Sequence, residues 1–263
     1  MTGSMQGKRG LIMGVANERS IAWGIAKAMA EAGAELAFTY QGEAFGKRLE
    51  PLAASVGSDF MVDVDVTDDA SLDTAFEQLG ARWDSIDFVV HAIAYSDKSE
   101  LTGRILDTSR ENFKNSMDIS AYSLIEVARR AHPLMVENGG TILTLTYMGS
   151  TRVTPNYNVM GVAKAALEST VRYLANDLGP EGIRVNAISP GPMKTLAGAA
   201  IGGARKTYKH TDQNAPMRSN ATLEAVGGAA VFLASDVGAC TTGEILRVDG
   251  GFHVLGMPQQ DNL

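Results

Sequence analysis

Three side chains that could take part in a reduction stand close together in the second half of the sequence: Tyr147, Tyr157 and Lys164. They follow residues 141–145, an apolar run typical of a buried strand. Two phenols and an ammonium group near a strand end can donate a proton or a hydrogen bond to an oxyanion developing on a substrate. These residue types therefore indicate a reductase of a carbonyl or a conjugated carbonyl.

The spacing of Tyr157 and Lys164 places both side chains on one face of a helix. The two residues are seven apart, almost two turns at about 3.6 residues per turn. The tighter spacing, with a tyrosine four residues before the lysine, is absent because Met160 occupies that position. For Tyr147 a purely structural role stays open, because buried tyrosines with a satisfied hydroxyl are common in protein cores.

Elements that could position these residues alternate along the chain. Continuous apolar strands separated by long helices indicate parallel βαβ units with helices on both faces of the sheet. We therefore predict one α/β domain over residues 1–263, with a doubly wound Rossmann-type parallel sheet of about seven strands. The expected strands are residues 10–15, 35–40, 60–66, 86–93, 141–146, 184–189 and 244–248, and the expected helices are residues 20–32, 44–56 (interrupted early by Pro51), 68–83, 110–137, 158–178 and 223–234.

The composition limits the possible partners and compartments. A net charge of −7 argues against nucleic acid as the main partner. No stretch approaches the roughly 20 apolar residues that cross a bilayer, and no signal segment opens the chain. Cys240 is the single cysteine, which excludes an internal disulfide, and no Cys/His cluster is present. We expect a cytoplasmic protein with no membrane contact and no metal.

The turn after the first predicted strand, residues 14–26, has the properties of a dinucleotide site although it lacks the G-x-G-x-x-G pattern. Gly14 permits a tight turn, and the small Ala16 allows the backbone to approach a ligand closely. Ser20 could cap the following helix and meet a phosphate, and Gly24 could let that helix pack closely on the sheet. A pyrophosphate would then lie at a positive helix N-terminus.

The ends of the second and third predicted strands favour NADH over NADPH. Gln41 stands where such sites carry a group for the ribose, and it offers no charge to a 2′-phosphate. The nearest cations, Lys47 and Arg48, lie at least one helical turn further on. Asp65 and Val66 could enclose the adenine, with the carboxylate meeting its exocyclic amine, although an ordinary exposed turn aspartate is the alternative.

Residues 91–94 lie at the end of the fourth predicted strand. Except for His91, their side chains are small enough to let a cofactor pass over the sheet edge. We expect His91 to be a hydrogen-bonded structural residue rather than an acid or base. Residues 191–214 are weakly periodic, and long irregular connections in compact domains often form lids. We predict a substrate lid there, with a variable surface loop as the alternative.

Together these residues resemble the short-chain dehydrogenase/reductase superfamily, and within it the divergent branch of NADH-dependent enoyl-acyl-carrier-protein reductases. The larger branch has Y-x-x-x-K and an N-A-G segment after the fourth strand, and this chain has neither. Ala94 stands where the resembled enzymes more often have glycine. The resemblance runs from Gly14 to about Phe252 and is carried by G-V-A-x(3)-S-I-A-x-G-I-A at residues 14–26, Tyr40-Gln41, Asp65-Val66, Tyr147-x9-Tyr157-x6-Lys164, G-P-M-K-T-L-A at residues 191–197 and V-D-G-G-F at residues 248–252.

The resemblance implies reduction of a trans-2-enoyl thioester on acyl carrier protein, the last step of fatty-acid elongation. Tyr157 would be the oxyanion donor, Lys164 would hold the nicotinamide ribose, and Tyr147 would shape the acyl pocket. The implied NADH/NAD contacts are Gly14, Ala16, Ser20, Ile21, Gln41, Asp65, Val66, Ile93, Lys164, Met193 (by its backbone) and Thr195 (on the pyrophosphate). The implied substrate contacts are Tyr147, Tyr157, Met160, Leu196, Ala197, Ala200 and Ile201.

A local basic cluster follows the predicted lid wall in this acidic chain, formed by Arg205, Lys206, Lys209 and His210. Acyl carrier protein is strongly acidic, so the cluster could steer it by charge, although a solvated helix face is the alternative. The resemblance further suggests a homotetramer. Two other functions stay open: a 3-oxoacyl or hydroxysteroid reductase with the same cofactor, and a non-catalytic NAD(H)-binding regulator.

Overall fold

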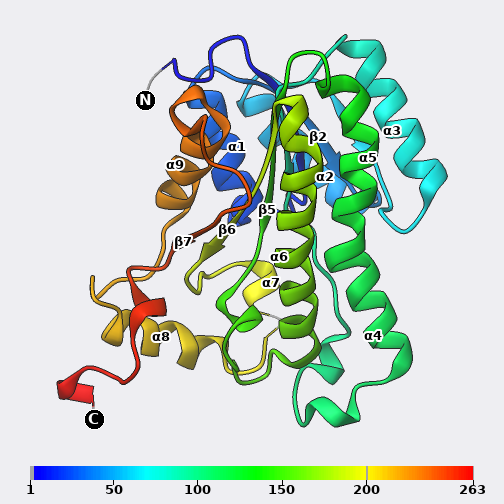
Figure 1. The fold of residues 1–263 in the computed structure, drawn as a ribbon. Coiled ribbons are helices and arrows are strands. Elements are labelled where there is room, and N and C mark those ends of the chain that lie inside the picture. The colour runs from blue at the N-terminus through cyan, green and yellow to red at the C-terminus, as the bar shows by residue number, and fades with distance from the viewer. Residues whose placement is uncertain (1–2, 200, 263) are drawn as a thin grey trace.

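A seven-stranded sheet forms the centre of the protein in the computed structural model, which describes residues 3–199 and 201–262 (Figure 1). The strand order is β3-β2-β1-β4-β5-β6-β7, and every neighbouring pair is parallel. This confirms the predicted doubly wound fold. The strands are β1 (Arg9–Met13), β2 (Glu35–Tyr40), β3 (Met61–Asp63), β4 (Phe88–His91), β5 (Gly140–Leu145), β6 (Ile183–Pro190) and β7 (Ile245–Val248).

Helices cover both faces of the sheet, which explains the continuous apolar runs of the strands. Along β1 the side chains alternate, so Leu11 and Met13 pack in one layer and Ile12 in the other. The first layer contains α3, α5 and α6, and the second contains α1, α2 and α9 (Figure 1). The helices are α1 (Ile21–Glu31), α2 (Glu43–Ser55), α3 (Asp69–Arg82), α4 (Arg110–Met117), α5 (Ser123–Met135), α6 (Asn158–Leu178), α7 (Leu196–Ala199), α8 (Ala204–Asn214) and α9 (Leu223–Ala234).

The helix predicted over residues 110–137 is wrong in one respect, because a π-helical stretch at Asp118–Tyr122 separates α4 from α5. Its buried Ser120 hydroxyl accepts a hydrogen bond from the Tyr95 backbone N–H and donates one to the Tyr95 carbonyl, at 3.0 and 3.1 Å. The wider turn thereby ties the helix to the loop after β4. π-Bulges often lie beside functional sites.

Two further expectations about helices need correction. Pro51 does not interrupt α2, which continues to Ser55. Proline has no N–H to donate to the Lys47 carbonyl four residues earlier, but both residues are exposed, so water can bond that carbonyl instead. Residues 191–214 are not wholly irregular, since they contain α7 and α8. The sequence of α8 is almost entirely polar, so it carries no apolar periodicity that could reveal it.

Candidate active site

The predicted site residues gather at the carboxyl edge of the sheet, where open parallel sheets bind ligands. Gly14 follows β1, Ile93 follows β4, Tyr147 follows β5 and Met193 follows β6. The strand order reverses between β1 and β4, and ligands of doubly wound sheets bind at such a switch point. Figure 1 shows α7 and α8 at the same end of the molecule as the C-terminus.

The two tyrosines meet, as their positions in the sequence suggested. Tyr157 is the N-cap residue of α6, and Tyr147 follows the end of β5. Their rings are 5.1 Å apart between centroids, in an edge-to-face arrangement at 67°. Tyr157 is only 6% exposed, and Lys164 on α6 is only 5% exposed. The structure therefore brings a phenol pair and a buried ammonium to the first two turns of α6.

The ring of Tyr157 lies against a position that only glycine can occupy. A Cβ atom on Gly149 would be 2.4 Å from Cδ1 and 2.7 Å from Cε1 of Tyr157. Gly149 lies in the 3₁₀ turn Met148–Ser150 that follows Tyr147. This turn thus forms one wall of the slot that orients the Tyr157 phenol.

The Tyr157 phenol is protonated and available as a donor. Burial, the neighbouring Tyr147 and the Glu168 carboxylate all raise the pKa of Tyr157 well above its ordinary value. No hydrogen bond joins the Tyr157 hydroxyl to another of the described residues. Burial and then the charge of Asp249 also raise the pKa of Tyr147. Both phenols therefore stay neutral at physiological pH.

The Lys164 ammonium contacts a backbone carbonyl. Its Nζ donates to the Leu145 oxygen at 2.8 Å, at the end of β5. Burial lowers the pKa of Lys164 to about 8, and the charge of Glu168 opposes that effect. An ammonium has three donors, so two remain for a ligand. Sequence reasoning missed Glu168, although its position four residues after Lys164 marked it as a carboxylate on the same helix face.

The turn after β1 has a glycine at positive φ and a serine in an unexpected role. Gly14 has a φ of 95°, and a Cβ there would lie 2.1 Å from the Ala92 carbonyl oxygen. The Ser20 hydroxyl accepts hydrogen bonds from the N–H groups of Ala16 and Asn17, both at 3.0 Å. Ser20 is the N-cap residue of α1, but its side chain does not cap the helix as expected. These two bonds use only the oxygen of the Ser20 hydroxyl and not its proton.

Gly24 packs against a helix and not against the sheet, contrary to our expectation. A Cβ on Gly24 would lie 2.8 Å from the Leu223 Cβ, and one on Gly227 would lie 2.8 Å from the Gly24 carbonyl oxygen. The glycines therefore allow α1 and α9 to approach closely. The glycine in the sequence predicted that α1 packs closely against another element, but it did not show that this element is α9.

The side chains of Gln41 and Asp65, which the sequence predicted as ribose and adenine contacts, lie together after β2 and β3. The Thr67 N–H and hydroxyl donate to Asp65 Oδ1 at 2.9 and 2.7 Å, and these bonds, with a smaller contribution from the Gln41 side chain, lower the pKa of Asp65. The neighbouring Val66 is half-buried in the core layer. Of the nearest cations, Lys47 pairs with Glu43 at 2.5 Å.

His91 has the structural role that we expected. It is fully buried, with Nδ1 3.0 Å from the Thr144 hydroxyl and Nε2 2.8 Å from the Ser123 hydroxyl. Burial, followed by the nearby Lys164 charge, lowers the pKa of His91 to about 3. The imidazole is therefore neutral and ties β4 to β5 and α5.

Four apolar residues form a small cluster beside the phenols: Leu101, Tyr157, Val159 and Met160, with Tyr147 and Ile201 packed against it. This places the predicted Met160 and Ile201 together, whereas Ala197 on α7 is exposed and Ala200 lies outside the described residues. Leu101, from the loop after β4, was not predicted, because that loop has no periodic pattern. The Thr195 hydroxyl accepts from the Gly198 N–H at 2.9 Å and so begins α7.

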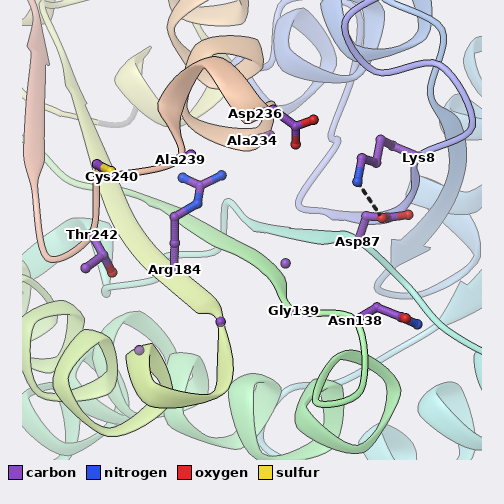
Figure 2. Close-up of a pocket in the computed structure, with 13 residues that line it drawn as sticks. Lys8, Asp87, Asn138, Gly139, Arg184, Ala234, Asp236, Ala239, Cys240 and Thr242 are labelled. Carbon is purple, nitrogen blue, oxygen red and sulfur yellow. Dashed lines mark hydrogen bonds and ion pairs between the residues drawn. The ribbon is translucent and has the colours of Figure 1, made fainter.

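A separate hollow of about 400 Å³ lies at the opposite, amino edge of the sheet (Figure 2). Three of its charged groups are engaged: Lys8 pairs with Asp87 at 3.1 Å, and Arg184 donates to the carbonyls of Leu233, Thr241 and Ser235. Arg184 thus joins β6 to the segment after α9. The hollow contains none of the predicted site residues.

The site combines a dinucleotide-type turn at the switch point of a parallel sheet with a buried phenol donor, which defines a nucleotide-dependent reductase. The described residues contain no group of three or more His, Cys, Asp or Glu side chains arranged to hold a metal ion. None of the described helices is both long and apolar enough to cross a membrane.

Comparisons with known proteins narrow this class. A model of the family described as Enoyl-(Acyl carrier protein) reductase matches residues 14–253. The whole chain is 59% identical to enoyl-(acyl-carrier-protein) reductase (NADH) 2 of Rhizobium meliloti (strain 1021), covering 98% of that protein. The structure is similar to an enoyl-(acyl-carrier-protein) reductase of Anaplasma phagocytophilum in complex with NAD, with 54% identity, a TM-score of 0.95 and 98% of each chain covered.

A further solved structure is the Bacillus cereus enoyl-acyl carrier protein reductase with NADP+ and indole naphthyridinone. It is 48% identical, with a TM-score of 0.95, and the match covers 98% of this chain and 100% of that one. The chain belongs to the enoyl-(acyl carrier protein) reductase family.

Proposed function

We propose that this protein reduces the 2,3 double bond of a trans-2-enoyl thioester carried on acyl carrier protein, with NADH as the hydride donor, in fatty-acid elongation. The observation that carries the proposal is the buried, protonated Tyr157 with an unpaired hydroxyl beside Tyr147. Membership of the enoyl reductase family supports the same reaction.

The chemistry needs a donor for an enolate oxygen. Bound NADH would supply a hydride to the β-carbon of the substrate. The negative charge would then rest on the thioester oxygen until a proton from solvent reaches the α-carbon and completes the reduction. The Tyr157 hydroxyl donates a hydrogen bond to that oxygen. No other described residue accepts a hydrogen bond from this hydroxyl before the substrate binds. Tyr147 fixes the Tyr157 ring from one side and borders the thioester end of the acyl pocket.

The residues around the sheet edge fit a dinucleotide. The tight turn at Gly14 leaves no room for a side chain, and the Ser20 hydroxyl stands at the start of α1 for the pyrophosphate. Lys164 has two free donors for the nicotinamide ribose. We assign the remaining cofactor contacts to Ala16, Ile21, Gln41, Asp65, Val66, Ile93, Met193 and Thr195.

The preference for NADH follows from charge near the ribose. The relative from Bacillus cereus was crystallised with NADP+, so family membership alone does not decide the cofactor. In this chain Lys47 is paired with Glu43, and the Arg48 guanidinium lies 5.7 Å from the centre of the Phe45 ring. Gln41 offers no charge to a 2′-phosphate. NADH is therefore the better partner of this site.

The acyl chain lies against the cluster of Met160, Ile201, Tyr147 and Tyr157, with Ala197 at its rim. The segment of residues 191–214 acts as the lid over this pocket. Its helix α8 carries the basic cluster Arg205, Lys206, Lys209 and His210, all exposed and without salt bridges to any described residue. Arg205, Lys206 and Lys209 are free to meet an acidic carrier protein, whereas the His210 ring contacts the Asn214 side chain and the Phe252 ring.

The protein works as a homotetramer in the cytoplasm. Large apolar side chains, Tyr122, Val162 and Tyr173, are 48%, 43% and 72% exposed on the π-helical stretch and α6, which favours burial against other copies. Light scattering after size-exclusion chromatography tests this assembly. A monomer at micromolar concentration would contradict it.

The deciding experiment follows the loss of NADH absorbance with a crotonyl or longer 2-enoyl thioester, compared with a 3-oxo thioester. Preferential turnover of the enoyl substrate supports the proposal, and preferential turnover of the 3-oxo substrate indicates another short-chain reductase. Tyr157→Phe should still bind NADH but lose about 10²–10³-fold in kcat, since it removes one oxyanion donor. Unchanged turnover in that variant would exclude Tyr157 as the donor.

A further inference from the structure

One buried carboxylate beside the reacting groups has no part in the reaction described above. Glu168 lies on α6, four residues after Lys164, and is only 5% exposed. A buried carboxylate is destabilising unless hydrogen bonds or an opposite charge compensate it. Glu168 accepts two hydrogen bonds, from Thr146 and Ser150 on either side of Tyr147, and the Lys164 ammonium lies one helical turn away on the same helix.

The hydrogen bonds of Glu168 reach the segment that carries Tyr147. Its Oε1 accepts from the Thr146 hydroxyl at 2.7 Å and from the Ser150 hydroxyl at 2.5 Å. Thr146 immediately precedes Tyr147, and Ser150 ends the 3₁₀ turn that follows it. Because Lys164 also donates to the preceding carbonyl, of Leu145, α6 holds the end of β5 on both sides of Tyr147.

The charge of Glu168 acts on the ammonium one turn away. Burial lowers the pKa of Lys164, and Glu168 is the anion that counteracts this among the described residues. The other titratable groups facing this region are His91 of β4, which is neutral, and the two phenols. Asp249, after β7, acts on Tyr147.

We propose that Glu168 is a positioning residue of the reductase: it fixes the Tyr147 turn against α6 through two hydroxyls and places its carboxylate one helical turn from the Lys164 ammonium that holds the cofactor ribose. This inference rests on the proposed function. It assigns two separable tasks to one carboxylate, one that needs its hydrogen-bonding geometry and one that needs its charge.

Two variants separate these tasks. Glu168→Gln keeps an oxygen that accepts from both hydroxyls but removes the charge. The pKa of Lys164 should then fall, so the decline of kcat/KM at alkaline pH (the alkaline limb of the pH profile) should move to lower pH by about one unit. The affinity for NADH, measured by fluorescence against pH, should show the same shift without any turnover. Glu168→Asp keeps the charge but shortens the reach, so the limb should stay while KM for the enoyl thioester rises about tenfold, as for one lost hydrogen bond.

Ser150→Ala is the matched control for geometry, because it removes one donor and leaves the carboxylate charged. It should raise KM and leave the alkaline limb in place. A lower melting temperature of Glu168→Gln with unchanged pH profiles would show a merely structural role and overturn the proposal, as would a wild-type KM in both Glu168→Asp and Ser150→Ala. If the wild-type protein does not turn over enoyl thioesters, the proposed function fails, whereas the NADH-affinity profile still tests the coupling of Glu168 to Lys164.

Discussion

Replacing Gly149 by alanine tests the slot that orients the Tyr157 phenol. The added Cβ would lie 2.4 Å from the ring, whereas carbon atoms pack at about 3.5–4.0 Å, so ring and turn must separate by about 1 Å. The turn cannot withdraw freely, since Glu168 holds Ser150 and the Gly149 carbonyl lies close over Gly161. The ring must therefore move, and with it the hydroxyl.

A displacement of about 1 Å in a reacting group can reduce turnover about 10²-fold. We expect Gly149→Ala to lower kcat with enoyl thioester by that order while NADH affinity, measured by fluorescence, stays within about twofold. Overpacking should also lower the free energy of unfolding by about 1–3 kcal/mol.

The control is Gly228→Ala in α9, where an added Cβ meets no atom within 4 Å. It should stabilise the protein by about 0.5–1 kcal/mol and leave kcat unchanged. A wild-type kcat in Gly149→Ala would refute the proposed slot.

Two other predictions concern the surface and the core. Replacing Arg205 and Lys206 by glutamate should raise KM for carrier-bound substrate and spare free thioester analogues, because only the carrier meets the basic cluster; equal effects on both substrates would exclude the cluster as a landing site. His91 has a pKa of about 3 in the folded protein against 6.5 in the unfolded chain, so only the unfolded state takes up its proton between these values. The stability from this residue is complete above pH 6.5 and declines below it, by about 1.4 kcal/mol per pH unit. Urea titrations from pH 7 to about pH 5 should show this slope, and His91→Gln should flatten it; equal slopes would contradict a neutral buried imidazole.

The parts of the fold that the sequence predicted well are those where one local rule dominates. Helix α6 was predicted at its observed bounds, because a long periodic segment follows a break at Pro155 and Asn156. The strands were recognised because both faces are buried, although β3, at the sheet edge, is much shorter than its apolar run. In contrast, α8 is polar on nearly all sides and is held by tertiary contacts, such as the bond from the Gln259 N–H to the Asn214 side chain.

The site was predictable in its residue types but not in its internal contacts. The sequence predicted Tyr147 and Tyr157 at one site from their places after β5 and before α6, but it did not predict the contact of their rings. That Ser20 bonds the turn amides instead of capping α1 depends on the conformation of residues 14–20, which no sequence pattern determines. The bonds of Glu168 to Thr146 and Ser150 are long-range in sequence and likewise appear only in the folded chain.

The seven-residue spacing of Tyr157 and Lys164 changes what must hold the phenol in place. A tyrosine four residues before the lysine would fall at position 160, inside α6, where the helix itself orients the side chain. Tyr157 instead stands at the N-cap of α6, so its ring is confined by Gly149 and Tyr147 of the preceding turn. Glu168 holds this 3₁₀ turn to α6 through its hydrogen bonds with Thr146 and Ser150. Donor geometry in this protein therefore depends on the β5–α6 connection, which is why alterations of Gly149 and of Glu168 should both affect the reaction although we assign neither residue a contact with the substrate.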